Sequence, residues 1–291
     1  MKTLMTSAAA ILMTAGVLAS CSAGKANATI NEPGTAATST AITPNTLNLK
    51  DFNAIDNTSV LTVVFTNGKQ YSVKVEERGD VPSVITKEGG TLVVKNSGND
   101  SGKKTNTYLY ITAPGLASVD NKGVMTFETD AMKSKDFSLQ NKGVFTFKAK
   151  GIDCTTLTLD NAGVLNSETG IKAGKMELTN NGVIKGSSDV NGGDLTLKSN
   201  GVGNLDVTFK GNDMAINCGG TGSINLDVDC KSVEASSSSP CSITISGRTG
   251  ECNIRKYNEY VGKIDISRLE DPQGELFSKK RVYIKKTQIK K

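Results

Sequence analysis

The stretches DNKGVMTF (Asp120–Phe127), QNKGVFTF (Gln140–Phe147) and DNAGVLNS (Asp160–Ser167) follow one another at intervals of twenty residues. The same phrase continues in weaker form as NNGVI from Asn180 and SNGVG from Ser199. A phrase that returns at a fixed period of this length is typical of a solenoid, in which each repeat forms one coil.

Two ladders of apolar residues run through the same region at spacings of 20, 20, 19, 19, 19 and 19 residues. The first ladder consists of Ala117, Phe137, Leu157, Met176, Leu195, Met214 and Val233, and the second of Val119, Leu139, Leu159, Leu178, Leu197, Ile216 and Ala235. The two members of each pair are separated by one residue that is usually polar, so both side chains point to one face of a strand. This pattern predicts an all-β, parallel β-solenoid with coils of about 19–20 residues.

An Asn-x-Gly corner follows each strand of the predicted solenoid. The corner residues are Asn121, Gly123, Asn141, Gly143, Asn161, Gly163, Asn180, Gly182 and Gly201. We expect the glycines to take a positive φ in these turns. The asparagines either stack their amides from coil to coil or simply favour turns, and both interpretations remain open. In either case the role of the corner is structural.

The N-terminus reads as a bacterial lipoprotein signal. Residues 1–20 contain Lys2 and an apolar run that is too short to span a bilayer, as in a secretory signal peptide. Leu18-Ala19-Ser20-Cys21 resembles a lipobox, which implies that Cys21 is lipidated and that the protein contacts a membrane through this lipid. Residues 21–45 read as a flexible tether. We expect an outer-membrane lipoprotein, and its orientation stays open because no acidic cluster follows Cys21.

The predicted β-helix domain covers residues 46–277, with irregular first coils over 46–115 and regular repeats over 116–266. Asn67-Gly68 lies between two alternating stretches in the first part and predicts a type I′ hairpin. The last fourteen residues, 278–291, hold seven basic residues and no acidic ones. They read as a final strand whose lysines discourage pairing, or as a basic tail that contacts anionic lipid or a partner protein.

The composition argues against several functions. The net charge of +5 arises in the tail, so the body is close to neutral and offers no basic face for nucleic acid. The chain has no His, which removes the most common general base and a common metal ligand. We expect no enzymatic activity, no cofactor and no metal site.

Four cysteines cluster near the end of the repeats. Cys230 and Cys252 are 22 residues apart, and Cys218 and Cys241 are 23 apart, close to one coil each. Residues stacked on adjacent coils fall within disulfide range, and the compartment beyond the inner membrane is oxidising. We expect these two pairings, with Cys154 as a buried thiol.

The sequence resembles the auto-transporter adhesin, head GIN domain family, which is found in lipoproteins of Bacteroidota. The resemblance covers about residues 47–266. It depends on the opening LNLKDFNAID, on GKQYSVKVE and GGTLVVKN, and on repeat units such as GTGSINLDV at Gly220–Val228. It implies a single-stranded, right-handed parallel β-helix that is displayed for adhesion, and it assigns no functional residue.

Three functions therefore remain open. The first is a non-enzymatic envelope lipoprotein that presents its β-helix for adhesion or for binding an unidentified glycan or protein. The second is a periplasmic structural lipoprotein with protein partners. The third, less favoured, is a polysaccharide-active enzyme, for which Asp206, Asp227 and Asp229 with Lys210 would have to meet on one face.

Overall fold

The computed structural model describes residues 45–97, 104–256, 262–270 and 283–284. The signal peptide, Cys21 and nearly all of the predicted tether lie outside the described residues, as does most of the basic tail. Within the described ranges we find no helix with the length and apolarity that a membrane crossing requires. The regular structure consists of strands.

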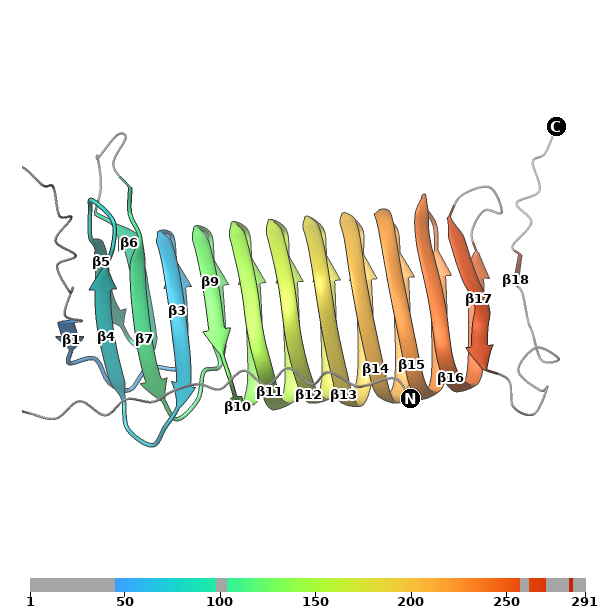
Figure 1. The fold of residues 1–291 in the computed structure, drawn as a ribbon, viewed down its shortest axis with the longest axis horizontal. Coiled ribbons are helices and arrows are strands. Elements are labelled where there is room, and N and C mark those ends of the chain that lie inside the picture. Colours follow the sequence, from blue (N-terminus) through green and yellow to red (C-terminus); the bar gives the residue numbers. More distant parts are fainter. Residues whose placement is uncertain (1–44, 98–103, 257–261, 271–282, 285–291) are drawn as a thin grey trace, which may run out of the picture. The chain divides into compact units, whose positions relative to one another are not determined.

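The regular part is a β-solenoid, as the period predicts (Figure 1). Its strands are β8 (Ser118–Asn121), β9 (Val124–Thr129), β10 (Met132–Asn141), β11 (Val144–Asn161), β12 (Val164–Asn180), β13 (Val183–Ser199), β14 (Val202–Cys218), β15 (Thr221–Ser237), β16 (Cys241–Lys256) and β17 (Lys263–Glu270). Each pairs in parallel with its equivalent one coil away, so that Leu139 lies beside Leu159 and Leu178 beside Leu197.

The two apolar ladders form the interior of the coils. Every member is buried except Ala117, which is half-buried, while the neighbouring Leu116 is fully buried. Burial of a large apolar side chain contributes about 1.5–3 kcal/mol, and the ladders repeat this contribution in each coil. The alternation of apolar and polar residues therefore specifies which face of each strand points inward.

A cluster of phenylalanines fills the interior of the first coils. The ring of Phe127 lies 6.1 Å from that of Phe65, 6.5 Å from that of Phe137 and 5.7 Å from that of Phe147. Such aromatic pairs contribute about 0.5–1.5 kcal/mol beyond the area that they bury. These ring contacts stabilise the packing of the N-terminal coils.

The corner asparagines stack their side-chain amides from coil to coil. Asn57 Nδ2 donates to Asn121 Oδ1 at 2.9 Å, and the same contact continues from Asn121 to Asn141 at 2.8 Å. It runs on to Asn161 and Asn180 at 2.7 Å per step, and Asn180 donates to Ser199 Oγ at 3.1 Å. These side chains are buried, so they hold the corners together and do not contact a ligand.

The corner glycines differ from the expectation, because none of them has a positive φ. Close packing of neighbouring corners requires glycine instead. A Cβ on Gly143 would overlap the carbonyl oxygen of Gly123, and a Cβ on Gly163 would overlap that of Gly143. Gly182 and Gly201 face their neighbours in the same way. The prediction of glycine was therefore made for the wrong physical reason.

The N-terminal strands do not follow the order of the sequence. They are β1 (Asn45–Leu47), β2 (Ala54–Asn57), β3 (Val60–Asn67), β4 (Ser72–Glu77), β5 (Ser83–Glu88), β6 (Thr91–Asn96) and β7 (Thr107–Ala113). The coil formed by β2 and β3 pairs in parallel with β8 and β9 on one side and with β6 and β7 on the other. Beyond β6 and β7 lie β5 and β4 in antiparallel orientation, and β1 pairs with β4.

The hairpin predicted at Asn67-Gly68 does not form. Strand β7 lies between β3 and β4 and pairs with both, and Gly68 N donates to Ala113 O at 2.9 Å. The N-terminal portion does contain a hairpin, but it joins β5 to β6 at Gly89-Gly90, where Gly89 has a φ of 60°. The Asn-Gly pair favours a tight turn locally, but β3 instead pairs with β7, which begins forty residues after Asn67.

At the other end, β17 pairs in parallel with β16, with an irregularity between Thr244 and Ser246. Part of the basic tail forms the short strand β18 (Tyr283–Ile284), which is also parallel to β16.

Candidate binding surface

The outward side chains of the solenoid form columns, because equivalent residues of successive coils lie in register. One column consists of the valines that follow the corners, Val60, Val124, Val144, Val164, Val183 and Val202. Five of them are 37–44% exposed, and Val164 is half-buried. The column forms a narrow apolar ridge along the coils.

A groove of about 890 Å³ runs across β3, β9, β11, β12 and β13. We call it the side groove. Small residues such as Ala131, Ala149 and Gly170 line it, and the pairing of β11 with β12 is irregular beside it, between Ala149 and Ile152. Strands in a sheet are about 4.8 Å apart, so five adjacent strands give the groove a length of about 19 Å. Its volume falls within the usual range of ligand sites.

Charged side chains border the side groove: Glu128, Asp130, Lys148, Lys150, Glu168 and Asp189. Lys148 Nζ lies 3.2 Å from Glu128 Oε1, and Lys150 Nζ lies 2.7 Å from Asp130 Oδ1. The second pair raises the pKa of Lys150, chiefly through its hydrogen bond to Asp130. Both ion pairs are exposed and therefore contribute little to stability.

Glu168 and Asp189 differ from the other carboxylates of the groove. Both are exposed. Within the described residues, neither makes a hydrogen bond or an ion pair. The groove therefore offers two carboxylates that can still accept hydrogen bonds. Its four acidic residues and two lysines together give its lining a net charge of −2.

One hydroxyl beneath the groove is also unpaired. Thr129 lines the groove and is 5% exposed. Its Oγ1 has no hydrogen-bond partner among the described residues. A buried polar group without a partner costs free energy, and this hydroxyl faces the interior of the coil with Met125 and Phe127, so it is not accessible to a ligand in the groove.

Tyrosines extend the surface toward the N-terminal end. Tyr110 lies in register with Val64 of the groove, and Tyr108 lies two residues away on the same face of β7. Arg78 covers the ring of Tyr108 at 3.8 Å from its centroid, and Tyr110 donates its hydroxyl hydrogen to Glu76 Oε2 at 3.0 Å. The hydrogen bond from Arg78 lowers the pKa of Glu76, and burial raises the pKa of Tyr110. The network holds the half-buried ring of Tyr110 in place.

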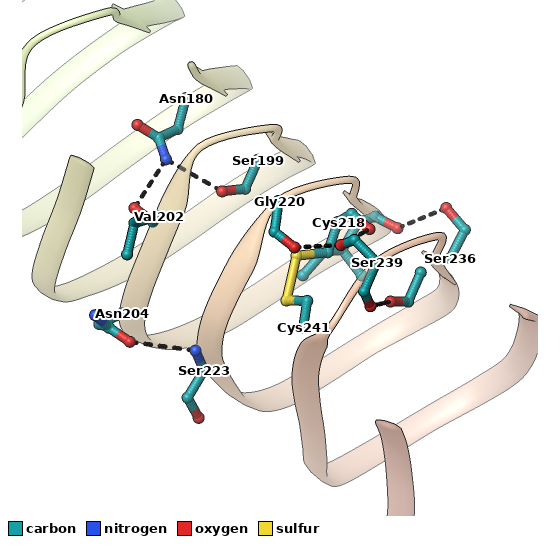
Figure 2. The surroundings of a disulfide bond; sticks show 12 residues. Asn180, Ser199, Val202, Asn204, Cys218, Gly220, Ser223, Ser236, Ser239 and Cys241 are labelled. Carbon is teal, nitrogen blue, oxygen red and sulfur yellow. Dashed lines mark hydrogen bonds between the residues drawn. A yellow bond between two sulfur atoms is a disulfide. The ribbon is translucent and has the colours of Figure 1, made fainter. Parts of the chain in front are cut away.

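A disulfide joins Cys218 to Cys241 (Figure 2). The Cα atoms are 6.3 Å apart, within the usual range. Cys218 occupies the corner position that asparagines hold in earlier coils, and Cys241 lies in register with Gly222. Around it, Ser239 Oγ donates to the carbonyls of Gly220 and Cys218, as Figure 2 shows. The disulfide thus links adjacent coils where the asparagine ladder has ended.

The disulfide expected between Cys230 and Cys252 is not formed. Cys230 carries a thiol and lies in register with Thr249, whereas Cys252 lies in register with Val233. The register offset in this part is 19 residues, so a separation of 22 places the two cysteines three positions out of alignment. Cys154 is a buried thiol, and burial raises its pKa to about 11.

Each of the three aspartates considered for an enzyme has its own polar partner on the neighbouring coil. Asp206 Oδ1 accepts a hydrogen bond from Asn225 at 2.7 Å, and Asp229 pairs with Arg248 at 3.0 Å. Asp227 accepts a longer hydrogen bond from Ser246 at 3.4 Å. Within the part of the chain that the structure describes, no group of three or more His, Cys, Asp or Glu could hold a metal ion.

The side groove was not predicted from the sequence. Its clearest signal is the run Glu128, Lys148 and Glu168, which repeats at twenty residues with alternating charge. That pattern also fits an ordinary solvated column, and the concave shape appears only in three dimensions.

A comparison with family models matches residues 51–208, more than half of the chain, to the family described as "Putative auto-transporter adhesin, head GIN domain". A putative adhesin from Bacteroides fragilis has a similar solved structure, with 19% identity, a TM-score of 0.52 and coverage of 77% of this chain and 95% of its own. A putative adhesin from Parabacteroides distasonis has 14% identity, a TM-score of 0.54 and coverage of 77% and 96%. At these identities the likeness shows the fold alone. No curated protein sequence matches the chain.

Proposed function

The chain belongs to the auto-transporter adhesin, head GIN domain family, and on that premise we propose that it is a non-enzymatic lipoprotein of the outer membrane whose solenoid binds a ligand for adhesion. The family name supports an envelope or surface-associated protein.

The side groove is the observation that carries the binding role. It is a hollow of about 890 Å³ on a rigid wall, bordered by six charged side chains, of which Glu168 and Asp189 have no partner among the described residues. Ligand sites are typically concave and carry a few polar groups that are free to bind. The columns of outward side chains on neighbouring coils would add further weak contacts with the ligand, beyond the contacts that it makes in the groove.

The Cys218–Cys241 disulfide supports a location beyond the inner membrane, because disulfides persist in oxidising compartments. The lipobox at Leu18–Cys21 supports attachment to a membrane through lipid. The predicted tether would join that lipid to β1 at Asn45.

Adhesion by intact cells tests the proposal. Cells that produce the protein and cells from which it has been deleted are compared for adhesion to surfaces coated with polysaccharide or with extracellular matrix protein. We expect deletion to reduce adhesion to at least one coated surface, and production from a plasmid to restore it. Equal adhesion of both strains to every surface would contradict the role.

A periplasmic lipoprotein with protein partners is the second candidate. One observation favours it: no acidic cluster follows Cys21 in the sequence, and such clusters direct lipoproteins to the cell exterior in some bacterial groups. In that case the protein would be protected in intact cells, and cross-linking would recover envelope proteins with it.

A further inference from the structure

We propose that the side groove binds a neutral glycan chain, with the Glu168 and Asp189 carboxylates accepting hydrogen bonds from sugar hydroxyls. This inference rests on the proposed binding function and names the chemistry of its ligand.

The charges of the groove disfavour an anionic ligand. Four carboxylates and two lysines give it a net negative charge, and both lysines are already paired with carboxylates. A glycan that carries carboxylates or sulfates would place like charges beside Glu168 and Asp189. The hydroxyl groups of a neutral sugar can donate to these two carboxylates without placing a like charge beside them, and hydrogen bonds to charged groups are the stronger kind.

The backbone of the groove disfavours a peptide that binds by strand addition. Strands β3, β9, β11, β12 and β13 form the groove, and each pairs with neighbouring strands on both of its edges. Only the short stretch of β3 after Val64 lacks a partner on the β9 side, and it is too short for a peptide backbone to add as a strand. Recognition must come from side chains, which repeat about every 4.8 Å along the groove.

An aromatic ring extends the same column. Tyr110, Val64, Glu128, Lys148 and Glu168 lie in register on successive strands. The Tyr110 ring is half-buried and fixed by its hydrogen bond to Glu76, so its conformational entropy is largely lost before binding. A sugar ring carries an apolar face of C–H groups, which packs well against an amphipathic tyrosine.

The groove also matches the shape of a chain. Its length of about 19 Å follows from five strands, and its volume of about 890 Å³ is spread along that length.

Surface plasmon resonance on the captured full-length protein in detergent tests the inference. The probes are the neutral polysaccharides dextran, mannan and galactan, the acidic polysaccharide polygalacturonate, and an oligolysine peptide. We expect at least one neutral polysaccharide to bind, and polygalacturonate to bind more weakly. Binding of only polygalacturonate or only oligolysine, or no binding of any neutral polysaccharide, would overturn the proposal.

Two double variants locate the site. Glu168→Gln with Asp189→Asn removes both unpaired carboxylates of the groove, and we expect affinity for the neutral polysaccharide to fall about tenfold or more. The matched control is Asp160→Asn with Asp194→Asn, which removes two exposed carboxylates outside the groove and should leave affinity unchanged. Equal affinities for the two double variants would overturn the assignment to the groove.

Two single variants test the aromatic ring. Tyr110→Ala removes the ring and should weaken binding several-fold, whereas Tyr110→Phe keeps the ring, loses only the hydrogen bond to Glu76 and should bind more weakly than wild type but more tightly than Tyr110→Ala. Retained binding by Tyr110→Ala would remove the ring from the site.

The inference and the proposed function fail in different ways. If cells that carry the groove double variant still adhere fully, the adhesion role stands and another surface carries it. If deletion leaves adhesion unchanged while the purified protein binds neutral polysaccharide in a groove-dependent way, the groove assignment stands and the adhesion role fails.

Discussion

Substitution of Asn141 by alanine should destabilise the solenoid far more than a turn preference would explain. The buried side chain accepts a hydrogen bond from Asn121 at 2.8 Å and donates one to Asn161 at 2.7 Å. Each lost bond costs about 1 kcal/mol. Asn161 Oδ1 loses the donor that it has in the structure, which adds about 1–3 kcal/mol for a buried unpaired acceptor. We expect a loss of about 3–5 kcal/mol in the free energy of unfolding.

The matched control is Asn181→Ala. Asn181 directly follows Asn180, the last asparagine of the ladder, but its side chain is exposed. It accepts a single hydrogen bond, from Asn200 at 3.0 Å. We expect a loss of about 0.5 kcal/mol or less. Urea unfolding followed by circular dichroism measures both variants. Hydrogen exchange across β10, β11 and β12 shows whether the damage is local, because repeat proteins can unfold in parts.

A small and similar effect of both substitutions, below about 1 kcal/mol, would refute the reasoning. In that case the asparagines would be present for their turn preference, and the stacked amides would contribute nothing beyond it.

Three further predictions follow from the interior of the coils. Gly143→Ala should cost at least about 2 kcal/mol in urea unfolding, because the new Cβ overlaps the carbonyl oxygen of Gly123 and the backbone must shift; an unchanged midpoint would contradict this packing. Reduction of the Cys218–Cys241 disulfide, or its removal by Cys218→Ser with Cys241→Ser, should lower stability by about 3 kcal/mol, as expected for a closed loop of this length; equal midpoints with and without reductant would argue against the bond. Burial raises the pKa of Cys154 to about 11, above the ordinary thiol pKa of about 9, so its contribution to stability is present below pH 9 and is lost as the pH rises through about 11. Alkylation of the native protein with iodoacetamide should therefore spare Cys154 at pH 8, and the stability difference between wild type and Cys154→Ala should shrink between pH 9 and 11.

The period of the sequence was sufficient to predict the regular coils, because each coil repeats the same local physics. Leu139, Leu159 and Leu178 are buried one above another as their spacing requires. The corner glycines were also located correctly, but the reason was not visible in the sequence. A positive φ and a close approach between neighbouring backbones both favour glycine, and only the packing of Gly143 against Gly123 distinguishes them.

Features that depend on contacts between distant segments were predicted poorly. The Asn67-Gly68 signal is strong for an isolated hairpin, but β7 enters between β3 and β4, and no local pattern reports that insertion. The Cys230–Cys252 pairing failed because a register offset of 19 residues, not 22, sets which residues meet. The side groove was missed for a related reason, because its charges are spaced like those of a solvated column and only the three-dimensional structure shows that they line a hollow.

Antibody labelling of intact cells tests the central claim most directly. An antiserum against the purified protein is applied to intact and to permeabilised cells, with a known periplasmic protein as the control for leakage. If the protein is an adhesin, we expect equal labelling of intact and permeabilised cells, whereas the periplasmic control should be labelled only after permeabilisation. Labelling that appears only after permeabilisation would place the solenoid inside the envelope and contradict the adhesion account.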